Sequence, residues 1–116
     1  MADNEVRRGY IYYADLGEKR GSVQKSVRPV LIIQNDVGNK YSPTVIVAPI
    51  SSKAKKKRRM PTHIVVNVRC LPMRSVVLLE QITTISKSQL LNRAGIMPPQ
   101  PMKRINKAIK TSVALR

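Results

Sequence analysis

The 116-residue chain contains no Phe and no Trp, and it has a single Cys and a single His. Without large rings, the core must be built from Val, Ile, Leu and Met, with four Tyr available for partly buried positions. Cys70 alone excludes an internal disulfide, and one Cys, one His and scattered acids do not supply the clustered ligands of a metal site. A glycine-rich phosphate loop is also absent, which argues against nucleotide triphosphate chemistry. We therefore expect neither a metal nor another cofactor.

Acidic residues are the second scarcity, because 6 Asp and Glu stand against 22 Lys and Arg, for a formal net charge of +16. From residue 37 onward, 16 residues are basic and only Glu80 is acidic. A field of this sign attracts polyanions and speeds their arrival. The partners to weigh are nucleic acid, an anionic membrane and a strongly acidic protein. Lys53 to Arg59 is the densest basic run, and it is either an arm for phosphates or merely a solvated loop.

Long apolar runs are missing as well. No segment reaches the length that spans a membrane, and no charged leader followed by an apolar core opens the chain. Together with the single cysteine, these features predict a cytoplasmic protein that does not bind a membrane.

The apolar segments that are present are short, rich in β-branched residues and bounded by Gly, Pro or Asn, which is typical of strands. Strands are predicted over residues 8–16, 30–33, 45–50, 62–68 and 75–82. No βαβ spacing appears, so residues 1–116 are predicted to form one mainly β (α+β) domain. A small antiparallel sheet or barrel with helices at its edges fits this pattern.

Two helices are predicted in the last third of the chain. Ser86 is placed to cap a short helix over residues 87–93 that Gly95 closes. A final helix follows Pro101, and its apolar residues fall on one stripe at 3.6-residue spacing. These are Met102, Ile105, Ile109 and Val113.

The segment from Val27 to Ser51 carries the main functional signal. Its two apolar runs, 30–33 and 45–50, flank a turn-rich connector over residues 35–43. If the two strands pair antiparallel through that connector, Arg28 before the first strand lies beside Ser51 after the second. A guanidinium and a hydroxyl would then meet at one rim of a sheet.

Arginine, hydroxyl, amide and one imidazole in a cationic protein suit the cleavage of RNA by its own 2′-hydroxyl, since the substrate then supplies the nucleophile. The protein must orient the phosphate, stabilise its added charge and move protons. Arg28 suits the charge, although a surface arginine that caps a strand is the plainer reading. His63 has the one side chain that titrates near neutrality, but a lone histidine in a strand is more often structural. Glu80, beside Gln81, either anchors neighbouring arginines or reads a base edge.

Four segments make the chain resemble the MazF/PemK family of toxin ribonucleases, most closely the MazF proteins of Gram-positive bacteria. They are RRGYIYYADL, GSVQKSVRPVLIIQNDVGNKYSPTVIVAPISS, MPTHIVVN and SVVLLEQITTIS. The resemblance implies a CcdB-like fold, a small SH3-type barrel with a short helix and a C-terminal helix. It implies a homodimer that cuts single-stranded RNA sequence-specifically without metal, leaving a cyclic phosphate and a 5′-hydroxyl. It also implies an acidic MazE-like antitoxin that blocks the RNA groove.

By position, the resemblance makes Arg28 the catalytic arginine and puts Ser51 where the family usually has a catalytic threonine. Val23 replaces the acidic residue of the family's Gly-Ser-Glu-Gln loop, which predicts altered activity and leaves Glu18 and His63 as substitute bases. The loop before Ser75 is about two residues shorter than in close relatives. Residues expected to contact RNA are Ser22, Gln24, Ser52, His63, Glu80 and Gln81.

Three other readings compete with an active ribonuclease. One is a catalytically impaired RNA-binding protein on the same fold, which the loss of the loop carboxylate and the high basicity favour. Another is a gyrase poison like CcdB, against which the Arg28–Ser51 pair argues. The last is a basic protein of the ribosomal type, which rests on composition alone.

Overall fold

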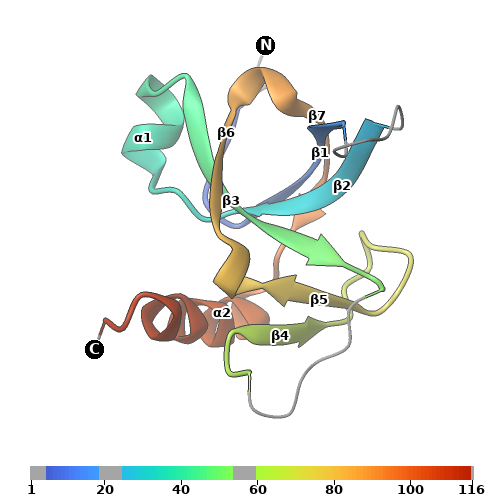
Figure 1. Cartoon of the computed structure of the whole chain (residues 1–116), viewed down its shortest axis with the longest axis vertical. Coiled ribbons are helices and arrows are strands. Elements are labelled where there is room, and N and C mark those ends of the chain that lie inside the picture. The colour runs from blue at the N-terminus through green and yellow to red at the C-terminus, as the bar shows by residue number, and fades with distance from the viewer. Residues whose placement is uncertain (1–4, 19–24, 54–59, 116) are drawn as a thin grey trace.

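The structure is a computed structural model that describes residues 5–18, 25–53 and 60–115. It consists of one strongly curved antiparallel sheet with a helix against its lower half (Figure 1). The seven strands are β1 (Tyr10–Glu18), β2 (Lys25–Ile32), β3 (Thr44–Ser51), β4 (His63–Val66), β5 (Ser75–Leu78), β6 (Thr83–Ser86) and β7 (Leu90–Ile96). The helices are α1 (Asp36–Tyr41) and α2 (Pro99–Ser112), with 3₁₀ turns η2 (Leu79–Gln81) and η3 (Lys87–Gln89). The mainly β class with a short helix and a C-terminal helix is confirmed.

Strand β3 is the centre of the sheet. The strand order is β4-β5-β3-β2-β1-β7, and β6 also pairs with β3. Thr44 to Val47 of β3 pair with β6, whereas Ile50 and Ser51 pair with β5. Within the described residues β6 and β7 do not pair, because η3 turns the chain between them. The small SH3-type barrel that the resemblance implied is therefore an open, curved sheet among the described residues and does not close.

Strand β2 is buried on both of its faces, which explains its unbroken apolar run. Leu31 belongs to the core cluster that α2 covers, whereas Val30 and Ile32 belong to a second cluster on the opposite face. Successive side chains of a strand point to opposite faces. When both faces are buried, every position is apolar and the usual alternation of apolar and polar residues is lost. The strand pair predicted around residues 30–33 and 45–50 is confirmed.

Helix α2 packs on the sheet through Ile105 and Ala108, with Met102 and Ile109 partly buried. Burying a side chain like that of Ile105 contributes about 1.5–3 kcal/mol. The predicted stripe is wrong at Val113, which is 63% exposed because the helix ends at Ser112. No helix in the described part of the chain is long and apolar enough to cross a membrane.

The connector over residues 35–43 is a helix and not a run of turns. The Asn35 side chain accepts a hydrogen bond from the amide of Gly38 at 2.8 Å and caps the N-terminus of α1. Asp36 in the first turn and Lys40 in the last turn carry charges opposite in sign to the partial charges of the nearby helix ends, which stabilises the helix. These local signals were present in the sequence, but a helix of six residues is too short to show apolar periodicity.

The predicted helix over residues 87–93 is wrong. Ser86 does cap a helical turn, and its capping box with Gln89 is formed, but that turn is only η3. Residues 90–96 continue as β7 and pair with β1. Likewise, the strand predicted over residues 75–82 ends at Leu78, where η2 begins.

Candidate functional site

Strands β2 and β3 bring Arg28 and Ser51 together. In the register of the two strands, Val30 lies opposite Pro49 and Leu31 lies opposite Ala48. Continuing this antiparallel register by two residues places Arg28 opposite Ser51, and both residues line one pocket of about 340 Å³. The predicted proximity of Arg28 and Ser51 at one rim of the sheet is therefore found.

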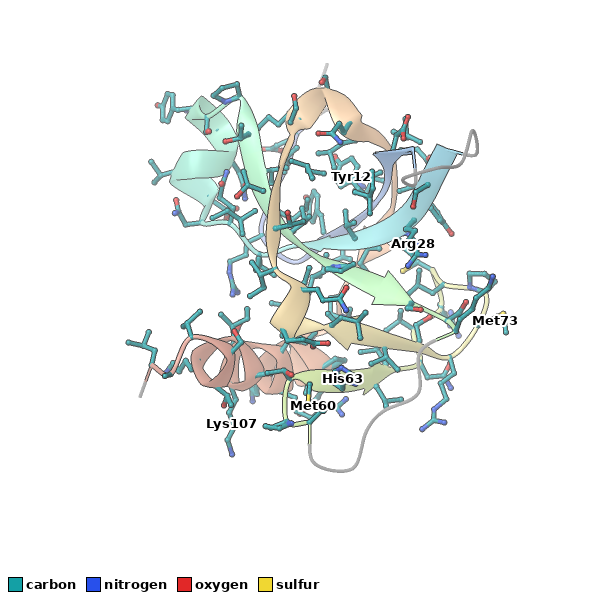
Figure 2. All side chains as sticks on the ribbon, viewed as in Figure 1. Tyr12, Arg28, Met60, His63, Met73 and Lys107 are labelled. Atoms are coloured by element: carbon teal, nitrogen blue, oxygen red, sulfur yellow. The ribbon has the colours of Figure 1, made fainter. Side chains whose placement is uncertain are left out.

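The pocket has a polar side and an apolar side. The polar lining residues are Arg28, Ser51, Ser52, Lys53 and Ser75. The apolar and aromatic lining residues are Tyr13, Val27, Pro29, Ile50, Leu71, Pro72 and Met73. Figure 2 shows Arg28 and Met73 on the same side of the molecule, where β3 and β5 lie next to each other. The arrangement can hold a small anionic group beside an apolar one.

Arg28 is, with Lys53, one of the two cationic residues of the described pocket lining. It lies in β2 opposite Ala14 of β1, and its side chain is half-buried. Its guanidinium forms no hydrogen bond or ion pair with any residue that the structure describes. The N–H groups of the planar guanidinium are therefore not bound to these residues and can donate two hydrogen bonds to oxygens of a phosphate.

Ser51 is held at the end of β3 by a local turn. Its Oγ accepts a hydrogen bond from the amide of Lys53 at 3.2 Å. Such a hydroxyl-to-backbone bond is common where serine ends a regular element. Val76 of β5 pairs with Ser51 on the other side, so both the backbone and the hydroxyl of Ser51 are positioned by neighbours. Its exposed neighbour Ser52 also lines the pocket.

His63 and Glu80, which were expected to contact RNA, bind each other. His63 Nε2 and Glu80 Oε2 are 2.7 Å apart, with 7% of the His63 side chain and 29% of the Glu80 side chain exposed. Neither residue lines the pocket. Within the described residues, Glu80 pairs with His63 and forms no ion pair with an arginine.

The pKa of Glu80 reflects two opposing influences. Burial is the largest single influence and raises the pKa of the carboxyl, but the hydrogen bond from His63, a backbone amide and the charge of His63 together outweigh burial and leave the pKa below its ordinary value. The Nδ1 atom of His63 is buried and has no hydrogen-bond partner among the described residues. The imidazole is thus part of a packed hydrogen-bonded pair between β4 and η2.

Several predicted positions lie outside the pocket or outside the described residues. Gln81 is exposed on η2, and Glu18 is the last residue of β1. Ser22, Val23, Gln24 and residues 54–59 of the basic run lie outside the described residues. Among the described residues, no three His, Cys, Asp or Glu side chains gather where they could hold a metal ion.

Sequence reasoning missed the apolar side of the pocket. Tyr13 had one usable signal, since it alternates with Tyr12, which is buried in the core. The loop residues Leu71 to Met73 had none, because they reach Ser51 only through the pairing of β5 with the end of β3.

The family of the chain follows from comparison with known proteins. Residues 7–113 match the family model described as PemK-like, MazF-like toxin of type II toxin-antitoxin system. The chain belongs to this PemK/MazF family. This MazF-type chain is 46% identical over 112 residues to "Endoribonuclease MazF" of Staphylococcus saprophyticus, covering 95% of the chain and 92% of the relative.

A second relative and a solved structure agree with this assignment. "Endoribonuclease EndoA" of Bacillus subtilis is 43% identical over 112 residues, which cover 95% of the MazF-type chain and 96% of the relative. A mycobacterial endoribonuclease in complex with its cognate antitoxin has the same fold, with a TM-score of 0.76 and 26% identity over 97% of each chain.

Proposed function

We propose that this MazF-type toxin endoribonuclease cleaves single-stranded RNA at a preferred sequence by attack of the substrate's 2′-hydroxyl, without a metal ion. The observation that carries the proposal is the shared pocket of Arg28 and Ser51 at the rim of the sheet. Two relatives with more than 40% identity are named endoribonucleases, which supports RNA as the substrate. The substrate supplies the nucleophile, so positioning and charge stabilisation are what the protein contributes.

The reaction is a transesterification within the RNA. The 2′-oxygen forms a bond to the adjacent phosphorus while the bond from phosphorus to the 5′-oxygen breaks. The 2′-hydroxyl loses its proton and the leaving 5′-oxygen gains one, so the products are a 2′,3′-cyclic phosphate and a 5′-hydroxyl. The phosphorane-like transition state carries an added negative charge. Arg28 stabilises that charge on the non-bridging oxygens, and the hydroxyl of Ser51 hydrogen-bonds the phosphate.

The described pocket lining supports charge stabilisation and not proton removal. Its residues include no carboxylate and no imidazole. His63 is engaged with Glu80, and Val23 stands where the family loop usually has an acid. We therefore assign Arg28 and Ser51 to the phosphate and assign no general base to the described lining.

An acidic MazE-like antitoxin and a second copy of the chain belong to the same proposal. The family is one of type II toxin-antitoxin systems, and the mycobacterial structure is a complex with a cognate antitoxin. A formal charge of +16 suits an acidic inhibitor, since complementary charge speeds association and favours the correct partner. The homodimer is proposed from the family resemblance.

The deciding experiment compares the wild-type protein with Arg28→Ala on a long RNA in the presence of EDTA. We expect the wild type to release fragments with 5′-hydroxyl ends and Arg28→Ala to lose about 10²–10³ in cleavage rate with unchanged thermal unfolding. Arg104→Ala is the matched control, because Arg104 is an exposed arginine of α2 outside the pocket. Full activity of Arg28→Ala would overturn the assignment. RNA binding by the wild type without fragments would favour the catalytically impaired RNA-binding protein.

A further inference from the structure

The apolar side of the pocket is not used by the chemistry assigned to Arg28 and Ser51. Cleavage at the phosphate requires charge and hydroxyl groups, whereas Tyr13 and the loop residues Leu71 and Met73 offer a ring and two aliphatic side chains. These residues come from β1 and from the loop before β5, and they meet at the end of β3. A surface of this composition beside a phosphate site suits the part of a nucleotide that is flat and apolar, its base.

Tyr13 is positioned by the strand that carries it. Its neighbour Tyr12 is buried in the core, so the alternation of the strand turns Tyr13 to the other face. Tyr13 pairs with Pro29, the residue after Arg28 on the adjacent strand, and Tyr13 and Arg28 both line the pocket. It is the only aromatic residue of the described pocket lining. Unstacked bases of single-stranded RNA are commonly held by stacking on such rings.

The loop of residues 69–74 is tied to the strand end that carries Ser51. The hydroxyl of Ser75, which is buried, donates a hydrogen bond to the carbonyl of Met73 at 2.9 Å. The next residue, Val76, pairs with Ser51 in the sheet. Leu71 is buried at the base of the loop, whereas the Met73 side chain is 61% exposed at the rim. A methionine at this place can adapt to a flat ligand, because its thioether chain is flexible and polarizable.

The size of the pocket limits what it can hold. Ligand pockets in proteins usually measure about 300–1,000 Å³. A pocket of about 340 Å³ is at the lower end of that range and has room for one base with its phosphate. A second nucleotide must lie outside it.

We propose that the base next to the scissile phosphate stacks on Tyr13 and lies against Met73, and that these two residues determine which base is accepted there. The inference rests on the proposed function, since it places a base relative to the phosphate that Arg28 holds. It adds a base-recognition role to two residues outside the catalytic pair.

The test is an abasic scan read by binding, so that it does not require cleavage. The site on a long RNA is first mapped by protection. Short RNAs of that site are then made with a 2′-deoxy nucleotide in turn at each position, and with each base removed in turn. Base-to-aromatic stacking usually contributes roughly 5- to 150-fold in affinity. We expect removal of the base at one position to weaken RNA binding by the wild type by that order. The same removal should weaken RNA binding by Tyr13→Leu by less than about twofold, since leucine cannot stack.

Tyr41→Leu is the matched control, because Tyr41 is 74% exposed on α1 and does not line the pocket. RNA binding by Tyr41→Leu should be weakened by base removal as much as RNA binding by the wild type is. The same abasic loss in Tyr13→Leu and in the wild type, at every position, would overturn the inference. A wild type that binds with base dependence but never cuts would overturn the proposed function, whereas the loss of the abasic effect in Tyr13→Leu would still support stacking of a base on Tyr13.

A further pair of variants tests the loop side of the pocket. Met73→Ala and Met73→Phe change the volume and shape of the rim without touching Arg28 or Ser51. We expect the ratio of kcat/KM values for the four bases at the Tyr13-dependent position to change by about fivefold or more in at least one variant, while thermal unfolding stays the same. Unchanged ratios in both variants would contradict a role for Met73 in base choice.

Discussion

Nε2 of His63 lies 2.7 Å from Oε2 of Glu80, and this contact joins β4 to the turn η2 beneath α2. The backbone supports the same junction, since the amide of Leu79 donates to the carbonyl of Thr62 at 2.9 Å. The only imidazole of the protein is therefore engaged in holding a strand of the sheet to a neighbouring 3₁₀ turn. This placement separates it from the pocket of Arg28 and Ser51.

Glu80→Gln should make the free energy of unfolding less dependent on pH in the acidic range. The pKa of Glu80 is lowered in the folded protein, so its ionised form contributes stability above the ordinary carboxyl pKa of about 4.5, and that contribution is lost as the pH falls through the lowered value. A hydrogen bond to a charged group contributes about 1.5–3 kcal/mol. We expect urea unfolding to show a loss of this order for Glu80→Gln at pH 7 and a smaller loss below pH ~4.

An equal loss at both pH values would contradict this account of the pair. The same variant also tests the prediction that His63 and Glu80 contact RNA. If they do, Glu80→Gln at pH 7 will bind RNA differently from the wild type under conditions in which both proteins are folded.

Ser51→Ala should lose cleavage activity, whereas Ser51→Thr should keep it. Alanine removes the hydroxyl from the phosphate, and we expect a loss in rate of about 10²-fold, similar to the removal of one transition-state hydrogen-bond donor. Threonine keeps the hydroxyl and restricts its rotamer, so its activity should equal or exceed that of the wild type. Initial rates on one mapped RNA site measure both, with Ser88→Ala on η3 as an exposed-serine control. Equal rates for the alanine and threonine variants would argue against a role for the hydroxyl.

RNA affinity should fall steeply with salt. Each phosphate contact to single-stranded nucleic acid changes the logarithm of the binding constant by about −0.7 per tenfold change in salt concentration. Four such contacts would weaken binding roughly fifty-fold between 50 mM and 200 mM salt. Titrations of a 2′-deoxy-protected RNA at several salt concentrations give the slope. Binding that is flat over this range would mean that the basic residues do not face the RNA.

Gly95→Ala should destabilise the protein through Cys70. A Cβ on Gly95 would lie 2.6 Å from Cβ and 2.7 Å from Sγ of Cys70, closer than packed atoms allow. Overpacking of this kind costs about 1–3 kcal/mol. In a Cys70→Gly background both opposing atoms are gone, so the same substitution should cost less when the unfolding free energies are compared in a double-mutant cycle. An identical cost in the two backgrounds would exclude the contact as the cause.

Much of the site could be predicted because it depends on neighbouring segments of the chain. The β-branched runs on either side of the 35–43 connector are short and apolar, and a short connector favours antiparallel pairing of the strands that it joins. That reasoning places Arg28 beside Ser51 before any coordinates are considered. The same local logic identified α2, because Ile105 and Ala108 recur at helical spacing and bury one face.

The sequence by itself therefore determined the mainly β class, the central strand pair and the juxtaposition of Arg28 with Ser51, since local periodicity and short connections carry that information. Only the tertiary structure decided that residues 90–96 form a strand, because their pairing with β1 overrides a local pattern that suits a helix. It also decided the partner of His63 and the apolar side of the pocket. Both depend on β5 and η2 packing against residues distant in the chain, and contacts of this kind leave no periodic signal in a single sequence.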